Sequence, residues 1–405
     1  MSKPVIDYRT FRNKSREEIL EVLLKYITVY EEESHLEEFK TKTWHPHLKV
    51  FIVRTYEFSP LSISERLKRY YYDKIKDKKF MDFMNIFTIL VVDLFSNNFY
   101  LKMENLETKE KFHFIIFSER NYWTIITLTK KEHLKRTILK IVNSIPELEI
   151  IKITSRHLEN LIHEQGYENN IKGFIAKYKP YQSERNITVD VYGGDLNDLN
   201  KIREIFFVEP TSFVYSLRNS PIGLVEGKIF FDGNFTLERI IEGNTQLAIE
   251  TIKNLSNSYE KINDFFYERV ELYDNAPTLI NSGKGLILKS RYIIVIKIKE
   301  NRIKRTEEDT FNIDKITYED LNKKIVNYFK NRPQRYLVYS DRPFSHFICD
   351  KATRNKVQLT IESKFNNIII YPLKNCKGMT LRDICNGVMK VESSIEAFEP
   401  YCYSN

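Results

Sequence analysis

The sequence predicts an α+β fold, with an N-terminal helix plus antiparallel meander region followed by two mixed α/β domains. Four short strand patterns follow one another between residues 86 and 128, and polar turns separate them, which is typical of an antiparallel meander. Helical and strand patterns alternate through the rest of the chain. A chain of 405 residues is also too long for one ordinary core, so two or three domains are expected.

The first predicted region, residues 1–175, begins with a helix. Ser15 and Glu18 fit a capping box in front of an apolar stripe with helical spacing. Residues 48–56 alternate between apolar and polar side chains, as a half-buried strand does. A second capping pattern at Ser62 predicts a helix through the following basic stretch.

The end of this region is predicted to switch from strands to helices. Thr129 and Glu132 fit the start of a helix that runs to Leu139. Residues 176–186 are polar, contain a proline and have no periodicity, so they are predicted to be a linker.

Two further domains are predicted beyond this linker. Residues 187–275 have the order strand, helix, strands, long helix, with Asp195 as the cap of the first helix. Residues 283–405 begin with a β-branched strand, and Thr317 with Asp320 then predicts another helix start.

Composition and charge point to a folded cytoplasmic protein with polyanionic partners. Hydrophobic residues make up 42% of the chain and aromatic residues 13%, which excludes a disordered chain. The net charge of +8 favours a polyanion as partner. Four cysteines are too few for a disulfide framework, and the longest apolar run is too short to span a membrane. No membrane association is therefore expected.

Residues 66–80, RLKRYYYDKIKDKKF, are the most informative stretch. Seven cations, two aspartates and three consecutive tyrosines suit a phosphate backbone with exposed bases, whereas a solvated helix face is the alternative interpretation. Helical spacing places the first two tyrosines near the core, which leaves phosphate contact as the stronger expectation. The predicted contacts are Arg66, Lys68, Arg69, Lys76 and Lys79.

Two more basic segments lie in the last third of the chain. The first follows a predicted strand, and the second is a loop around a proline. The three segments together predict a groove only if they share one face of the molecule. The additional predicted nucleic-acid contacts are Lys297, Lys299, Arg302, Lys304, Arg305, Arg332 and Arg335.

A metal-dependent nuclease is the first alternative hypothesis. Such a site needs an aspartate at a strand end and, on the next strand, an acid separated by one residue from a lysine. The acids bind Mg²⁺ and the lysine orients water. Asp341 with Glu362 and Lys364 fits this pattern, and residues 226–228 repeat its second half. Short patterns of this kind also arise by chance.

The leading hypothesis is a nucleic-acid-binding recognition subunit without an active site of its own. It would work in a larger assembly, such as a prokaryotic defence system or a mobile element. No cofactor is expected, and Mg²⁺ is required only by the nuclease alternative. His346 with three of the cysteines lacks the spacing of a zinc site. A third hypothesis is a protein-interaction scaffold whose basic helix docks onto an acidic partner.

Overall fold

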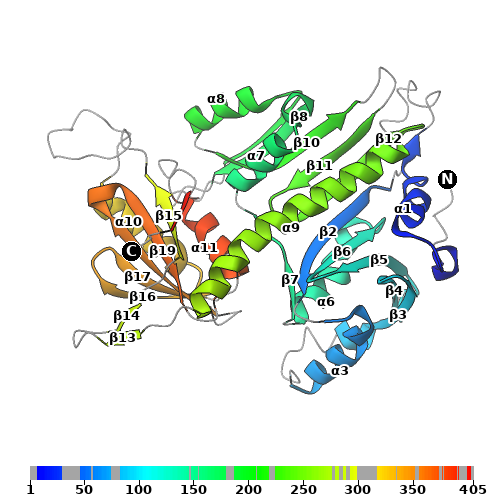
Figure 1. Ribbon diagram of the computed structural model, residues 1–405, viewed down its shortest axis with the longest axis horizontal. Coiled ribbons are helices and arrows are strands. Elements are labelled where there is room, and N and C mark those ends of the chain that lie inside the picture. Colours follow the sequence, from blue (N-terminus) through cyan, green and yellow to red (C-terminus); the bar gives the residue numbers. More distant parts are fainter. Residues whose placement is uncertain are drawn as a thin grey trace. The chain divides into compact units, whose positions relative to one another are not determined.

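A computed structural model shows an arrangement of mixed helices and strands (Figure 1). It describes residues 7–29, 46–55, 58–73, 83–145, 147–153, 155–178, 187–206, 208–218, 224–275, 279–281, 286–288, 292–298, 317–333, 335–351, 355–373, 376, 378–389, 391 and 399–402. A large antiparallel sheet and a smaller sheet, both accompanied by helices, confirm the predicted α+β class. Among the described helices, none is both long and apolar enough to cross a membrane.

The chain divides into two compact units that are interleaved in sequence. The first unit contains residues 1–151, 161–173 and 212–260, and the second contains the remaining three segments. Helices α7 and α9 and strands β8 and β10 therefore have residues in both units. The predicted division into three domains, residues 1–175, 187–275 and 283–405, stays a prediction.

The first unit is built on antiparallel strands with helices on both faces. Its sheet has the order β3-β4-β5-β6-β2-β12-β11-β10, with β7 also beside β2 and β1 parallel to β12. Its elements are η1 (Tyr8–Thr10), α1 (Arg16–Leu24), β1 (Thr28–Val29), β2 (Leu48–Thr55), η3 (Pro60–Ser62), α3 (Ile63–Asp73), β3 (Phe87–Phe95), β4 (Asn98–Asn105), β5 (Lys111–Glu119), β6 (Tyr122–Thr127), α5 (Lys131–Leu134), α6 (Ile138–Ser144), β7 (Leu148–Ile150), η4 (Glu168–Asn170), β11 (Val225–Phe230) and β12 (Asn234–Ile241).

Strand β2 lies at the centre of this sheet, between β6 and β12. All eight of its residues are buried, although the alternating sequence predicted one exposed face. Helices α3, α5 and α6 cover one face. Helix α9 runs along the other, where Tyr259 stacks on Phe235 at a centroid distance of 6.2 Å (Figure 1). The polar residues of β2 are therefore buried because helices cover both faces of a central strand.

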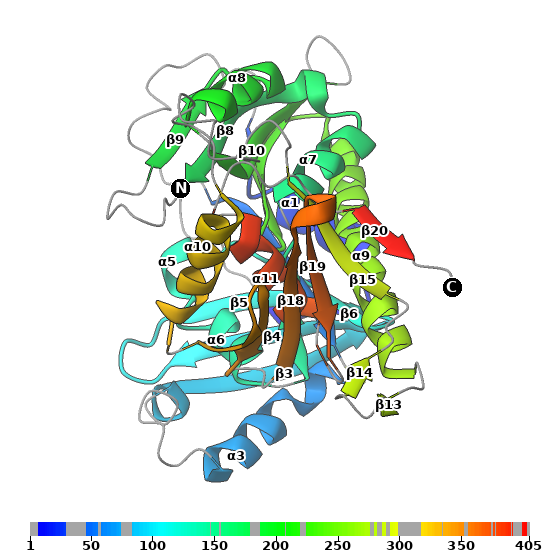
Figure 2. The same cartoon turned by 90° about the vertical axis from the view of Figure 1, so that its left-hand side faces the viewer.

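The second unit contains a smaller antiparallel sheet with the order β16-β17-β18-β19-β15-β20, of which Figure 2 labels β18, β19, β15 and β20. Helices α10 and α11 contribute buried apolar side chains next to it. The remaining elements of the chain are α7 (Ser155–Glu164), β8 (Ile171–Tyr178), β9 (Ile187–Tyr192), α8 (Leu196–Phe206), β10 (Glu209–Leu217), α9 (Thr245–Asn275), β13 (Leu279–Asn281), β14 (Leu286–Leu288), β15 (Tyr292–Lys297), α10 (Tyr318–Lys330), β16 (Tyr336–Arg342), β17 (Ser345–Asp350), β18 (Asn355–Glu362), η6 (Ser363–Phe365), β19 (Asn367–Pro372), α11 (Gly378–Met389) and β20 (Glu399–Cys402).

Local sequence signals locate several helix starts correctly. Ser15 and Glu18 form the predicted capping box, and the Thr317 side chain accepts a hydrogen bond from the backbone N–H of Asp320. Asp195 accepts hydrogen bonds from the N–H groups of Asn197 and Asp198, the second and third residues of α8. Each of these signals uses groups within three residues, so tertiary packing does not override them.

The helix predicted from Thr129 to Leu139 is wrong, because the chain forms two short helices there. The Thr129 N–H bonds the hydroxyl of Thr127, and α5 begins without a side-chain cap. Thr137 has non-helical dihedral angles and its hydroxyl donates to the carbonyl of His133. This local hydrogen bond competes with helix propagation and ends α5.

Candidate nucleic-acid interface

Three helices of the first unit pack on the same face of its sheet. Ile63 and Leu67 of α3, Leu134 of α5 and Ile138 of α6 belong to one buried cluster, together with side chains from β2, β4, β5 and β6. Figure 2 shows these helices beside that sheet. Because the apolar sides of the helices face the sheet, their polar sides are presented together outward.

The connection between α5 and α6 is strongly basic. Residues 130–140 contain five cations and a single acid, Glu132. Lys135 and Arg136 are exposed, and neither has an ion-pair partner among the described residues. We call residues 130–140 the α5–α6 basic segment. The sequence pattern predicted only a helix here, although the five cations of residues 130–140 are a signal for a basic surface.

Positive charge continues from this segment onto the sheet. Lys131 lies 5.5 Å from the centre of the Phe230 ring on β11. Thr236 of β12 is the cross-strand partner of both Lys49 and Lys228, so these three side chains lie in a row on one face. We call the set of cations that these elements present the basic face; it consists of Lys49, Lys68, Lys130, Lys131, Lys135, Arg136, Lys140 and Lys228.

Lys49 is the buried member of the basic face. Only 9% of its surface is exposed, and its ammonium group donates to the carbonyl of His47 at 3.0 Å. Burial lowers the pKa of Lys49 to about 8, the carboxylate of Glu238 opposes this, and the charge of Lys131 adds to the lowering. An approaching anion therefore stabilises the charged form of this desolvated lysine.

Acidic groups neutralise only part of this charge. Glu238 lies 3.4 Å from the ammonium of Lys228 and 3.8 Å from the ring of His47. Glu147 is bonded to Arg66, which removes Arg66 from the cations available to a ligand. Lys68, two residues further along α3, is exposed and has no such partner among the described residues.

The other predicted contacts of the first basic stretch are described only in part. The backbone of Arg69 belongs to α3, and its side chain lies outside the described residues, as do Lys76 and Lys79. In the second unit, the backbone of Lys297 ends β15. The remaining contacts predicted for this segment, Lys299, Arg302, Lys304 and Arg305, also lie outside the described residues.

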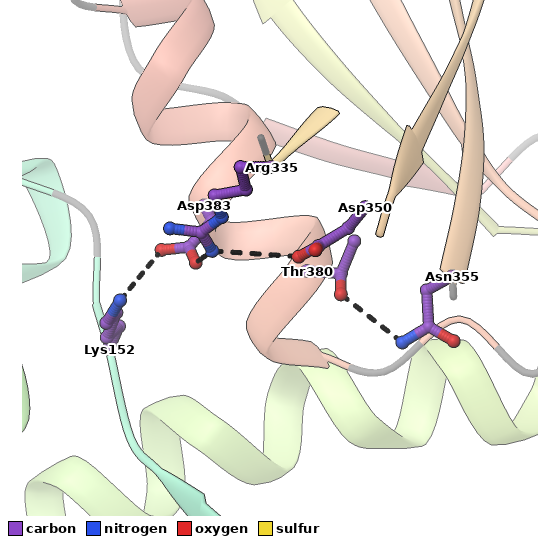
Figure 3. A network of polar contacts seen from close by, with 6 residues as sticks. All are labelled: Lys152, Arg335, Asp350, Asn355, Thr380 and Asp383. Carbon is purple, nitrogen blue, oxygen red and sulfur yellow. Dashed lines mark hydrogen bonds and ion pairs between the residues drawn. The ribbon is translucent and has the colours of Figure 1, made fainter. Parts of the chain in front are cut away.

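Arg332 and Arg335 make contacts within the second unit. The guanidinium of Arg332 lies 3.7 Å from the centre of the Tyr328 ring and donates to the Tyr328 carbonyl at 2.6 Å. Arg335 donates to Asp383 of α11 and lies 3.6 Å from the fully buried carboxylate of Asp350 (Figure 3). Internal partners of this strength favour a packing role for both arginines.

Asp383 is the centre of this polar network. The ammonium of Lys152 lies 3.4 Å from its carboxylate, opposite Arg335 (Figure 3). Beside it, Asn355 donates to the hydroxyl of Thr380 at 3.2 Å. The network joins α11 to strands β16 and β17, and its two cations have the carboxylates that they need.

The residues of the nuclease hypothesis lie on strands that are not neighbours. Asp341 is on β16 and Glu362 ends β18, and β17 pairs with both strands between them. Two strand spacings are about 10 Å. The hypothesis required neighbouring strands, and this expectation was wrong. Lys364 follows in η6, with its ammonium 5.4 Å from the Phe365 ring.

The second copy of the acid–lysine pattern has a packing explanation. Glu226 and Lys228 flank Gly227 on β11, and a Cβ atom at Gly227 would lie 1.9 Å from the carbonyl oxygen of Thr236. The glycine is therefore required by the close approach of β12. Within the described part of the chain, no group of three metal-binding side chains gathers.

No protein-family model matches this chain, and a search of curated proteins finds no match. The function is therefore argued from the charges and contacts of the basic face.

Proposed function

We propose that this protein binds nucleic acid by contacting its phosphates with the basic face of the first unit. The observation that carries the proposal is the alignment of cations from α3, the α5–α6 basic segment, β2 and β11 on one side of one sheet. Unpaired surface cations bind polynucleotides because each phosphate contact releases condensed counterions. The protein supplies recognition in this proposal, and a partner in an assembly supplies any chemistry.

The test is a salt titration of binding, with fluorescence anisotropy of labelled single-stranded and duplex oligonucleotides of DNA and of RNA. Lys135 and Arg136 are both replaced by alanine, since both are exposed and neither contributes to the core. The matched control replaces Lys25 and Lys172, which are exposed and lie outside the basic face. Both double variants lose the same charge, so a difference between them reports position.

We expect the K135A/R136A variant to bind roughly tenfold or more weakly near 0.1 M salt, because two phosphate contacts are lost. The slope of log K against log salt should fall by about 0.7–0.9 for each contact. Equal binding by both double variants, or wild-type binding that does not change with salt, would reject the proposal. Polyglutamate serves as competitor: if it displaces the oligonucleotide at equal charge concentration, the basic face recognises acidic protein instead.

A further inference from the structure

A pocket of about 660 Å³ lies in the first unit, away from the basic face. Its walls are the start of α1, the turn between β3 and β4, and the turn between β5 and β6. This volume is in the range of sites for small organic ligands. The lining residues that matter for its chemistry are Arg16, Phe95, Asn98, Glu119 and Arg120.

Asn98 lines this pocket and carries a hydrogen-bond donor without a partner among the described residues. The residue is fully buried, and its Oδ1 accepts from Nε of Arg16 at 3.3 Å. Arginine only donates, so this contact determines which end of the amide is the oxygen. Nδ2 is buried and has no hydrogen-bond partner among the described residues. A buried unpaired donor costs about 1–3 kcal/mol, and a ligand oxygen would relieve this cost.

Some of the charged side chains around the pocket have partners in the described residues, and one has none. Arg16 is bonded to the carboxylate of Glu119 and donates to the carbonyl of Ser118 at 3.1 Å, so these two side chains neutralise each other. Glu18 accepts from the backbone N–H of Ser15 at 2.7 Å as part of the capping box. Arg120 is exposed and has no ion-pair partner among the described residues. Arg120 is therefore the lining cation available to an anionic group, while the carboxylate of Glu18 keeps its negative charge.

Phe95 adds an aromatic surface to the same pocket. Its side chain is 64% exposed, although it ends a strand of the sheet. The carboxylate of Asp93 accepts from the Phe95 N–H at 2.9 Å and holds the turn in place. An exposed ring beside an available cation is the arrangement on which planar bases stack.

We infer that this pocket binds a nucleoside monophosphate, with the base on Phe95, an acceptor atom at Nδ2 of Asn98 and the phosphate near Arg120. The ligand is either a free nucleotide or the terminal nucleotide of a strand, because both carry the same groups. The first turn of α1 carries the carboxylates of Glu17 and Glu18, so the phosphate is placed at Arg120 and not at the helix start. Asn98 supplies the observation that does not depend on the helix.

Isothermal titration calorimetry with AMP, GMP, CMP and UMP tests this inference on the full chain. Ribose 5-phosphate lacks the base and adenosine lacks the phosphate, and each should bind at least tenfold more weakly than the preferred nucleotide. Arg120→Gln should weaken binding about tenfold, because the charged contact is lost. Lys109→Gln is the matched control, since Lys109 is also exposed and also has a left-handed backbone, at φ 58° against 49° for Arg120.

Asn98→Asp keeps an acceptor for Arg16 and removes the Nδ2 donor, so it should weaken binding at least tenfold. Phe95→Ala and Arg120→Gln change exposed side chains and keep the test valid if the Asn98 variant does not fold. The inference is overturned if none of the four nucleotides binds saturably, or if all three variants bind as wild type does.

One further measurement distinguishes a free nucleotide from a strand end as the ligand. Another shows whether nucleotide binding in the pocket is independent of the basic face. Competition by a 5′-phosphorylated oligonucleotide, but not by its unphosphorylated form, supports a strand end, whereas equal failure of both supports a free nucleotide. The K135A/R136A variant should keep full affinity for the nucleotide, because Lys135 and Arg136 do not line the pocket. If that variant loses the nucleotide as well, the pocket is not the binding site.

Discussion

Two titratable side chains of the first unit, the buried Lys49 and the partly buried His113, have pKa values far from their ordinary range. Burial removes water from the charged form of each side chain and thereby lowers both pKa values. A lysine and a histidine with lowered pKa values affect stability in different pH windows. Each therefore makes a separate prediction at the scale of one residue.

Replacement of Lys49 by methionine should stabilise the protein at pH 7. The pKa of Lys49 is lowered to about 8, so below pH 8 the folded state holds a desolvated charge. The unfolded chain binds more protons between pH 8 and about 10.5, and wild-type stability should therefore rise with pH across that window. We expect K49M to gain roughly 2 kcal/mol at pH 7 and to lose the rise.

Thermal melting from pH 7 to 10.5 measures this effect. Lys25→Met is the control, because Lys25 is exposed. A K49M protein that melts at or below the wild-type temperature at pH 7 would contradict the prediction. The same variant also has a use in binding assays, because it removes a cation from the basic face without creating a cavity.

His113 predicts loss of stability in acid. Burial lowers the pKa of His113 to about 4, the charges of Lys102 and Lys111 add to this, and Asp7 opposes them. The unfolded chain takes up a proton below about pH 6.5 and the folded chain does not, so stability is complete above pH 6.5 and falls toward pH 4. Asparagine at this position should reduce that fall by roughly 2–3 kcal/mol.

Urea unfolding at pH 7, 5.5 and 4.5 tests the prediction for His113. His163→Asn is the comparison, because His163 is exposed whereas His113 is partly buried. Asparagine retains a polar group near the hydroxyl of Tyr100, which lies 2.6 Å from Nδ1 of His113. Parallel curves for wild type and H113N would show that another group causes the acid sensitivity.

At the scale of elements, ionic contacts hold α11 to the strands of the second unit. Asp383 is on the helix, Arg335 precedes β16, and Asp350 ends β17. The sequence interpretation assigned Arg335 to phosphate binding because it stands in a polar loop. The structure gives it two carboxylates instead, and local sequence carries no signal for partners that are distant along the chain.

Asp383→Ala should destabilise the second unit by roughly 2–3 kcal/mol. The variant leaves Arg335 and Lys152 without their shared carboxylate, and partial exposure of both cations keeps the loss below that of a fully buried pair. Asp383→Asn retains an acceptor and should lose less. Lys364→Ala is the control, because it changes an exposed side chain. Denaturant unfolding measures all three, and equal midpoints for D383A and wild type would contradict the packing role.

At the scale of the whole molecule, the sequence predicted the fold class and the local caps but only part of the candidate interface. Capping signals at Ser15 and Thr317 succeeded because they act within one helical turn. Lys68 was predicted from its own helix. Lys49 and Lys228 became neighbours through their common partner Thr236, and this register depends on strands that are far apart in sequence.

The positions of the positive charges matter more for binding a polyanion than the net charge of +8 does. Cations of the second unit are partly used in its own ion pairs, whereas Lys68, Lys135 and Arg136 of the basic face have no ion-pair partner among the described residues. Free cations on one face steer a polyanion and raise its local concentration. Ionic strength should therefore govern the rate of association as well as the affinity.

The pairing of β2 with β12 also has a consequence for how the chain reaches its native state. Strand β2 leaves the ribosome early, whereas β12, its neighbour in the centre of the sheet, is made only after most of the first unit. Until then β2 has β6 on one side, whereas on the other side β7 pairs only with residues 53–55 and leaves residues 48–51 as an unpaired edge. Such non-local pairing slows folding and exposes an apolar strand edge during synthesis. The central strand of the finished protein is thus the segment most in need of protection in the nascent one.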